Sequence, residues 1–266
     1  MFRKNPSLAI KAGKRAVELD KNHGSGYTIL GYAYKIKKPV NFGFLDYSSL
    51  EKRHHFCLEE LRLNQRLAPD LYLEVVAITG NPAAPTINAE TEAFEYAVKM
   101  REFPQSAQLD RVKLSTDHID QLAQKLAAFH QQIPQAAADS PWGDAAKIYE
   151  PMLENFTQIR EIKLADEQSL LEIETWTNSE YQKLIPVLQA RKQAGFIREC
   201  HGDMHLANMV LLNNVVVIFD GIEFNPYLRW IDVISELAFT LMDLQDRNHY
   251  DLATQLLNSY LEITGD

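Results

Sequence analysis

Asp203, Asn208 and Asp220 are the residues of this sequence whose types and spacing best suit catalysis. Asn208 and Asp220 flank two short apolar runs, which are separated by the turn-forming pair Asn213-Asn214. This pattern predicts a β-hairpin, and a hairpin brings its two open ends together. An amide oxygen and a carboxylate placed side by side at those ends are hard oxygen ligands suited to Mg²⁺.

Asp203 adds a second carboxylate, which lies shortly before Asn208 on the loop that enters the same end of the hairpin. A metal-binding pair beside a separate carboxylate is what phosphoryl transfer requires. The metal neutralises the phosphates, while the extra carboxylate orients or deprotonates the accepting hydroxyl. The three residues therefore predict an ATP- and Mg²⁺-dependent phosphotransferase that acts on an alcohol group.

His201 and His205 bracket Asp203 and invite a different interpretation, a metal-dependent hydrolase built on these three residues. Such an enzyme would hold a transition metal tightly. It would have no need of an asparagine and an aspartate at the two ends of a hairpin. We therefore expect the histidines to support the loop through hydrogen bonds.

The elements that must position these residues begin with a small sheet. Aromatic and aliphatic residues alternate with polar ones from Tyr27, which indicates strands within residues 23–40. Residues 48–67 have helical periodicity, with Ser48 or Ser49 as the N-cap. Residues 71–78 and 93–100 are strand-like, and the glycines and prolines between them predict a connecting loop.

After Pro104 the pattern becomes mainly helical. Helices are expected at residues 119–130, over most of 145–195, at about 228–245 and at 248–263, with a dense β segment at 197–224. Ser115 or Thr116 is the N-cap candidate of the first of these helices. The sequence thus predicts an α+β protein with a boundary near residues 101–106.

The catalytic stretch and its neighbours resemble the aminoglycoside phosphotransferase and choline kinase superfamily. Residues 201–208 read HGDMHLAN, which matches the HGDxHxxN form of a kinase catalytic loop. Two longer blocks resemble one uncharacterised bacterial branch of that superfamily: AYKIKKPVNFGFLDYSSLEKRHHFCLEELRLNQRLAP and FDGIEFNPYLRWIDVISELAFTLMDL. The likeness covers roughly residues 30–245.

This resemblance implies a two-lobed, protein-kinase-like fold. The N-terminal lobe, residues 1–103, would be a small antiparallel sheet with one helix. The C-terminal lobe, residues 104–266, would be mainly helical and would hold the catalytic loop and the metal-binding hairpin. Relatives usually continue with further helices, so a C-terminal lobe truncated at Asp266 is an open alternative.

The resemblance also implies roles by position. Lys35 would pair with the α- and β-phosphates, with Lys37 as the alternative. Glu60 on the following helix would pair with that lysine, with Glu59 as the alternative. Asp232 resembles a structural aspartate that braces the catalytic loop.

Further positions are implied for binding of the nucleotide. Met100 resembles the residue before the hinge, and the hinge itself, Arg101-Glu102-Phe103, would offer backbone groups to adenine. Gly24 and Gly26 are the candidates for a loop that covers the phosphates. Asn208 and Asp220 would hold the Mg²⁺.

The overall composition is that of an ordinary globular protein. The 266 residues carry a formal net charge of -9, and an acidic chain repels nucleic acid unless its basic residues gather into a patch. No apolar run approaches the roughly 18 residues that a membrane helix needs. The two cysteines have no metal-ligand spacing, which favours a reducing, cytoplasmic location. We therefore expect no nucleic-acid and no membrane partner.

The acceptor is expected to be a small molecule with a hydroxyl group, since the superfamily phosphorylates aminoglycosides, sugars, choline-like amines and other alcohols. Members of the branch that the sequence resembles are sometimes fused to a P-loop kinase domain, so a fused or separate P-loop kinase is an expected partner. The alternative function is that of a nucleotide-binding regulatory module with weak or no catalysis.

Overall fold

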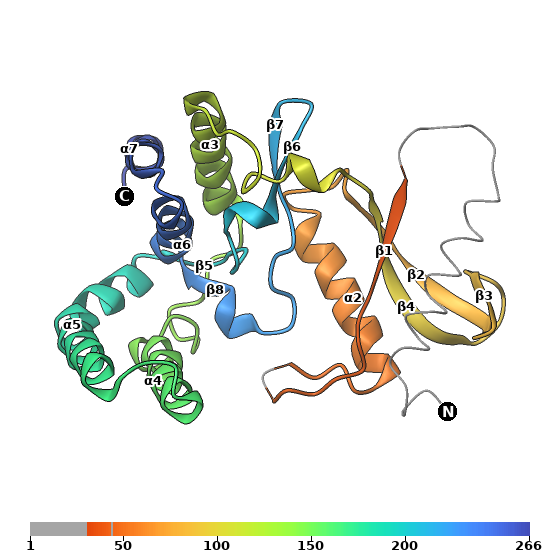
Figure 1. Ribbon diagram of the computed structural model, residues 1–266, viewed down its shortest axis with the longest axis horizontal. Coiled ribbons are helices and arrows are strands. Elements are labelled where there is room, and N and C mark those ends of the chain that lie inside the picture. Colours follow the sequence, from red (N-terminus) through yellow and green to blue (C-terminus); the bar gives the residue numbers. More distant parts are fainter. Residues whose placement is uncertain (1–30, 44) are drawn as a thin grey trace.

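The computed structural model describes residues 31–43 and 45–266. The candidate phosphate-covering residues Gly24 and Gly26, and the helix or arm expected at residues 1–22, lie outside the described residues. Within that part of the chain, a sheet and one helix are followed by a mainly helical region (Figure 1). The predicted α+β organisation is confirmed at this level.

The sheet is antiparallel and has four strands in the order β1-β4-β2-β3. The strands are β1 (Tyr32–Ile36), β2 (Tyr72–Asn81), β3 (Ala84–Ile87) and β4 (Ala93–Arg101). In β1, Lys35 pairs with Val98 and Ala33 pairs with Met100 of β4. Because side chains alternate along a strand, Ala33 and Lys35 lie on one face of β1, as the sequence predicts.

The connecting loop predicted between residues 78 and 93 is wrong in part, because strand β3 forms there. Ala84–Ile87 pairs with Ile78–Asn81 of β2 across a short turn. Pro85 is tolerated because β3 is the edge strand, where a missing backbone N–H removes no ladder bond to a second neighbour. Glycine and proline content therefore predicted a loop where a short edge strand pairs with β2.

Helix α2 (Leu50–Asn64) packs against β2 and β4. Its N-cap is Ser49, whose hydroxyl accepts a hydrogen bond from the backbone N–H of Lys52. The buried face of α2 contains Cys57, Glu60 and Leu63 at helical spacing. A glutamate on the buried face of a helix requires a charged partner, and this one finds its partners at the candidate site.

The helical region contains α3 (Thr116–Gln132), α4 (Ala145–Ile162), α5 (Glu167–Gln193), α6 (Val233–Asp246) and α7 (Tyr250–Thr264). Helix α3 begins at the N-cap Ser115, and its apolar face packs against α7, which also contacts α6. Helices α4 and α5 pack on each other and stand at one side of the molecule (Figure 1). The core of this region therefore lies among α3, α6, α7 and the strands that they cover.

Short elements connect these helices and include two further antiparallel pairs. They are η2 (Gln105–Ala107), β5 (Ile197–Glu199), η3 (Leu206–Asn208), β6 (Met209–Leu212), β7 (Val215–Ile218), η4 (Pro226–Leu228) and β8 (Trp230–Asp232), of which the η elements are 3₁₀ turns. Strand β5 pairs with β8, and β6 pairs with β7. The predicted hairpin is thus confirmed.

Helix α6 begins later than the sequence predicts. The expected helix starts at about residue 228, whereas the observed helix starts at Val233. The preceding residues form β8 because they pair with β5, and Asp232 then caps α6 by accepting a hydrogen bond from the N–H of Ile234 at 2.9 Å. Pairing with a distant strand thus replaced the first turn of the expected helix.

Among the described residues, no helix combines the length and the apolar character that crossing a lipid bilayer demands.

Candidate active site

The β6–β7 hairpin holds Asn208 and Asp220 at its open end. The closed end is the turn at Asn213 and Asn214, whose φ angles of 50° and 62° are left-handed. At the other end, the N–H of Phe219 donates to the carbonyl of Asn208 at 2.9 Å. Asp220 follows directly, itself at a φ of 65°, so the two predicted metal ligands leave neighbouring strands at the same place.

Asp203 is hydrogen-bonded to Asn208. The amide Nδ2 of Asn208 donates to the Oδ2 and to the backbone carbonyl of Asp203, both at 3.0 Å. These bonds fix the Asp203 carboxylate relative to the hairpin. They also engage the nitrogen side of the amide, so that the oxygen Oδ1 is the atom of Asn208 that remains for a cation.

Lys35 joins the sheet to this hairpin. Its Nζ lies 2.8 Å from Oε1 of Glu60 and 2.5 Å from Oδ1 of Asp220. Of the two candidate glutamates on α2, the structure brings Glu60 to the lysine, whereas Glu59 pairs with Arg62 at 2.9 Å. Three predicted residues from β1, α2 and the end of β7 thus meet.

The charges of this group stabilise one another. Burial alone would lower the pKa of the Lys35 ammonium, but the neighbouring carboxylates of Glu60 and Asp220 outweigh it and hold that pKa well above its usual range. Burial would likewise raise the pKa of Asp220, yet Lys35 keeps it below its ordinary value. Lys35 is therefore a cation and Asp220 an anion at neutral pH.

Lys37, the alternative to Lys35, lies deeper in the protein. Its Nζ contacts Glu60 and Glu223, and the hydroxyl of Tyr47 donates to the same Glu223 oxygen. Glu60 thus bridges two lysines, because one carboxylate oxygen faces each of them. Neither Tyr47 nor the bridge was predicted, since Tyr47 depends on how the loop before α2 folds and the bridge on how α2 lies against β1.

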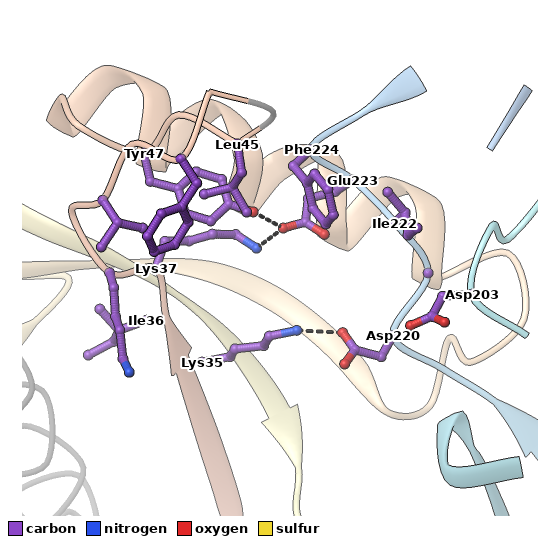
Figure 2. A pocket seen from close by; sticks show the side chains of 14 residues that line it. Lys35, Ile36, Lys37, Leu45, Tyr47, Asp203, Asp220, Ile222, Glu223 and Phe224 are labelled. Atoms are coloured by element: carbon purple, nitrogen blue, oxygen red, sulfur yellow. Dashed lines mark hydrogen bonds and ion pairs between the residues drawn. The ribbon is translucent and has the colours of Figure 1, made fainter. Parts of the chain in front are cut away.

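A pocket of about 380 Å³ opens beside this charged group (Figure 2). Its lining comes from three segments: β1 with the loop that follows it, Asp203, and the stretch after β7. The lining residues are Lys35, Ile36, Lys37, Lys38, Val40, Phe42, Leu45, Tyr47, Asp203, Asp220, Gly221, Ile222, Glu223 and Phe224. Lys35, Asp203 and Asp220, predicted from separate parts of the sequence, share this one pocket.

The predicted hinge residues lie outside this lining, on the chain that leaves β4. Met100 is buried at the end of β4, and the N–H of Glu102 donates to the carbonyl of Gly31 at 2.8 Å. The ring of Phe103 packs edge-on against Phe219 at a centroid distance of 5.0 Å. The segment after β4 therefore contacts the open end of the β6–β7 hairpin through the ring of Phe103.

Glu236 braces the loop at residues 201–208, and the prediction that Asp232 has this role is wrong. Oε1 of Glu236 accepts hydrogen bonds from the N–H groups of His201 and Gly202, each at 2.7 Å. Asp232 instead binds the Arg191 guanidinium at 2.6 and 2.8 Å, besides capping α6. A glutamate within the apolar stretch ISELAF was the available signal, because a charge on the buried face of a helix must have partners.

The two histidines flank Asp203 in different ways. Nε2 of His201 lies 2.9 Å from the carbonyl of Phe219, and its Nδ1 accepts from the N–H of Asp203 at 3.3 Å. Burial lowers the pKa of His201, in keeping with a neutral ring that donates from Nε2. His205 Nε2 lies 3.5 Å from Asp203 Oδ2. His201 thus supports the loop through hydrogen bonds, as the sequence predicts.

Gly202 cannot be replaced by a larger residue without moving the loop. Its φ is 88°, and a Cβ atom there would lie 2.6 Å from the carbonyl oxygen of Leu228. Glycine at this position therefore lets the loop turn where the N–H groups of His201 and Gly202 bind Glu236. This turn places Asp203 at the pocket.

His130, Cys200 and Glu236 form a second group with metal-ligand chemistry, whose ligand atoms lie within 4.8 Å of one another. These atoms are already engaged, because His130 bonds Glu236 and Tyr260, each at 2.8 Å. The thiol of Cys200 faces the carbonyl of Ile231 at 3.6 Å. The group is thus the buried support of Glu236.

The donor atoms at the end of the hairpin suit Mg²⁺. The carboxylate of Asp220 and the amide oxygen of Asn208 are hard oxygen ligands, which Mg²⁺ prefers to nitrogen or sulfur. The Asp220 side chain is 40% exposed and lines the pocket, so that a hydrated ion and phosphates can reach it. The donor chemistry of both residues therefore fits the ion that the sequence implies, whereas the pocket reaches Asp220 only, because Asn208 is buried and lies outside the lining.

Comparisons with known proteins give relatives but no family. No protein-family model matches the chain. Uncharacterised proteins of Mycobacterium tuberculosis and Mycobacterium bovis are 26% identical to it over 240 residues, which is 88% of this chain and 47% of each relative. The chain thus spans about half the length of the curated relatives that it matches.

Proposed function

We propose that this chain is an ATP- and Mg²⁺-dependent phosphotransferase with a two-lobed, protein-kinase-like fold, which moves the γ-phosphate of ATP to a hydroxyl of a small molecule. The N-terminal lobe would end at residue 103 and the C-terminal lobe would begin at residue 104. One observation carries the proposal: Lys35, paired with Glu60, meets Asp220 and Asp203 at a single pocket. A cation for phosphates, a metal ligand and a free carboxylate are the parts that phosphoryl transfer needs.

Each residue has a distinct role in this proposal. Lys35, held in place by Glu60, binds the α- and β-phosphates, and Lys37 supports Glu60 from its other side. Asn208 and Asp220 hold Mg²⁺, which when bound neutralises phosphate charge. Asp203 orients the accepting hydroxyl and takes its proton, because its hydrogen bonds from Asn208 leave Oδ1 without a bond from that amide.

Adenine would bind at the hinge formed by Met100, Glu102 and Phe103. Backbone groups of the chain that leaves β4 would supply the donor and acceptor that a purine edge needs, apart from the Glu102 N–H, which is bonded to Gly31. Phe103 contacts Phe219 of the hairpin, so the hinge and the metal ligands belong to one packed unit.

The proposal is tested by separating nucleotide binding from turnover. ATP with Mg²⁺ at about 100 times its Kd should stabilise the wild-type chain by about 2.7 kcal/mol, a shift of several degrees in Tm. Lys35→Met and Asp220→Asn should lose most of this shift, because they remove the phosphate cation and a metal ligand. Asp203→Asn should keep the shift and lose about 10²- to 10⁴-fold in ATP consumption with an accepting alcohol.

The matched control is Asp139→Asn, which neutralises an exposed aspartate away from the pocket. It should keep both the ATP-dependent shift and the turnover. A wild-type chain that shows no Mg²⁺-dependent shift with ATP contradicts the proposal. A shift without turnover for any alcohol supports the alternative, a nucleotide-binding regulatory module.

The expected P-loop kinase partner belongs to the same proposal. The mycobacterial relatives are about twice as long as the part that matches this chain, which leaves room for a further domain in those proteins. We propose that a P-loop kinase, fused or separate, acts together with this phosphotransferase.

A further inference from the structure

The pocket beside Asp203 has an apolar side that the transfer chemistry does not use. Val40 and Leu45 line it from the loop between β1 and α2, and Ile222 and Phe224 line it from the stretch after β7. All four side chains are partly buried. Phosphates and Mg²⁺ gain nothing from such a surface, whereas its position next to the carboxylates suits a second ligand with an apolar body.

The first apolar wall is a structured loop, which we call the β1–α2 loop (residues 40–43 and 45–47). The N–H of Phe42 donates to the carbonyl of Leu45 at 2.9 Å, and the N–H of Tyr47 donates to the carbonyl of Val40 at 2.8 Å. A guanidinium nitrogen of Arg53 on α2 donates to the carbonyl of Tyr47 at 3.1 Å. The two described parts of the loop are therefore tied to each other and to α2, and they present Val40 and Leu45 to the pocket.

The second wall is tied to the first at its base. Glu223 lies between Ile222 and Phe224, and its carboxylate accepts hydrogen bonds from Tyr47 of the β1–α2 loop and from Lys37 (Figure 2). These three polar side chains are at least nine-tenths buried. The two walls are thus held at a set distance, and the space between them is part of the fold.

The charges that line the pocket balance. Lys35, Lys37 and Lys38 are matched by Asp203, Asp220 and Glu223. Lys37 pairs with Glu223 and Lys35 with Asp220, so two of the three acids are already neutralised by lysines. A polycation such as an aminoglycoside would meet no surplus of negative charge there.

We propose that the acceptor is a compact alcohol with an aromatic or branched aliphatic body, which lies between the two apolar walls with its hydroxyl at Asp203. The pocket of about 380 Å³ is at the small end of ligand pockets and also receives the phosphates and Mg²⁺ at Lys35 and Asp220, so the acceptor has only part of this volume. The phosphorylation of this alcohol rests on the proposed function, whereas the binding of the alcohol rests on the pocket alone.

In the proposed reaction the γ-phosphate of ATP moves to the hydroxyl of this acceptor. The hydroxyl oxygen forms a bond to the γ-phosphorus of ATP, while the bond between that phosphorus and the oxygen bridging to the β-phosphate breaks. The proton of the hydroxyl passes to the Asp203 carboxylate, and ADP leaves with the bridging oxygen. The product is a phosphate monoester of the apolar alcohol.

Binding without turnover provides the first test. Saturation-transfer NMR with 2-phenylethanol and 3-methylbutanol should show binding to the wild-type chain, with kanamycin as the polycationic comparison. Ile222→Asp and Leu45→Asp place a charge in opposite walls and should each weaken alcohol binding about tenfold or more. Ile222→Leu keeps the apolar volume and should bind nearly as the wild type does. Comparing the Tm of each variant with that of the wild type shows that it is folded.

ATP consumption with the same compounds provides the second test. Turnover with the apolar alcohols that is lost in Asp203→Asn supports the inference. Turnover with kanamycin alone, or no alcohol binding in the wild type, overturns it and leaves the phosphotransferase proposal standing. Alcohol binding that depends on both walls, with no effect of ATP and Mg²⁺ on Tm, refutes the proposed function and keeps the pocket assignment.

Discussion

Glu236 is the buried carboxylate on which the position of Asp203 depends. It is 1% exposed, and one of its oxygens holds two N–H groups of the loop while the other faces His130. We expect Glu236→Ala to lower the free energy of unfolding by roughly 3–5 kcal/mol, because the loop donors and the ring of His130 lose their acceptor in the interior. Urea denaturation at neutral pH measures this difference.

The acid sensitivity of the protein should also depend on Glu236. Burial would raise its pKa, but the hydrogen bond with His130 and the N–H of Gly202 lower it below the ordinary value of 4.5. The stabilisation is therefore complete above about pH 4.5 and is lost as the pH falls through the folded pKa. Glu236→Gln, which cannot titrate, should lose less stability than the wild type between about pH 5 and pH 3. Equal acid losses in the two proteins would contradict this assignment.

At this scale the sequence predicts residue types better than residue contacts. Spacing within one hairpin was sufficient to bring Asn208 and Asp220 together, because the geometry is local. Helical phase left Glu59 and Glu60 unresolved, and only the position of α2 against the sheet selects Glu60. Asp232 and Glu236 are one helical turn apart, so a resemblance in that block could not tell the cap of α6 from the brace of the loop.

The turn of the β6–β7 hairpin is the element that aligns the two metal-ligand candidates. Asn213 and Asn214 both have positive φ, a conformation that asparagine and glycine adopt far more readily than alanine. Asn214→Ala should lower the free energy of unfolding by about 1–2 kcal/mol. Asn214→Gly, the matched control, should be neutral within about 0.5 kcal/mol. Chemical denaturation of both variants measures these differences. Equal losses of unfolding free energy in the two variants would show that the side-chain amide of Asn214, rather than its φ angle, stabilises the turn.

Elements defined by local pattern were predicted well, and elements defined by distant pairing were not. Ser49 and Ser115 begin their helices as capping chemistry predicts. Strand β3 exists because β2 offers it an edge, and β8 exists because β5 lies beside it. A sequence window contains neither partner, so glycine, proline and helical periodicity gave the wrong local assignment in these two places.

The sheet with α2 and the helical region form one unit through two kinds of contact. An apolar cluster joins Tyr72 and Val98 of the sheet to Val210 and Phe219 of the hairpin. Beside it, the Glu199 carboxylate on β5 binds arginines from both regions. Contacts of this kind join residues more than 100 positions apart in the chain, such as Arg62 and Glu199, and no spacing rule in the sequence predicts them.

Glu199 provides the test of how strongly the two regions are coupled. Arg62 of α2 contacts it through two nitrogens at 2.8 and 3.1 Å, and Arg229 contacts it at 3.2 Å. Glu199→Ala removes the carboxylate 3.2 Å from the buried Arg229 guanidinium, which keeps Glu59 at 3.6 Å, and should lower the free energy of unfolding by roughly 1–3 kcal/mol. Glu74→Gln, which removes an exposed partner of Lys99, should change it by less than about 1 kcal/mol.

Two probes can follow the two regions separately in this variant. The three tryptophans, Trp142, Trp176 and Trp230, all lie in the helical region, so their fluorescence follows its unfolding. Hydrogen exchange at the amides of β2 and β4 follows the unfolding of the sheet.

In the wild type the free energies of opening from the two probes should agree, because the apolar cluster and the Glu199 network make unfolding cooperative. In Glu199→Ala the sheet should open at a lower free energy than the helical region. Values that remain equal would show that the apolar cluster alone couples them.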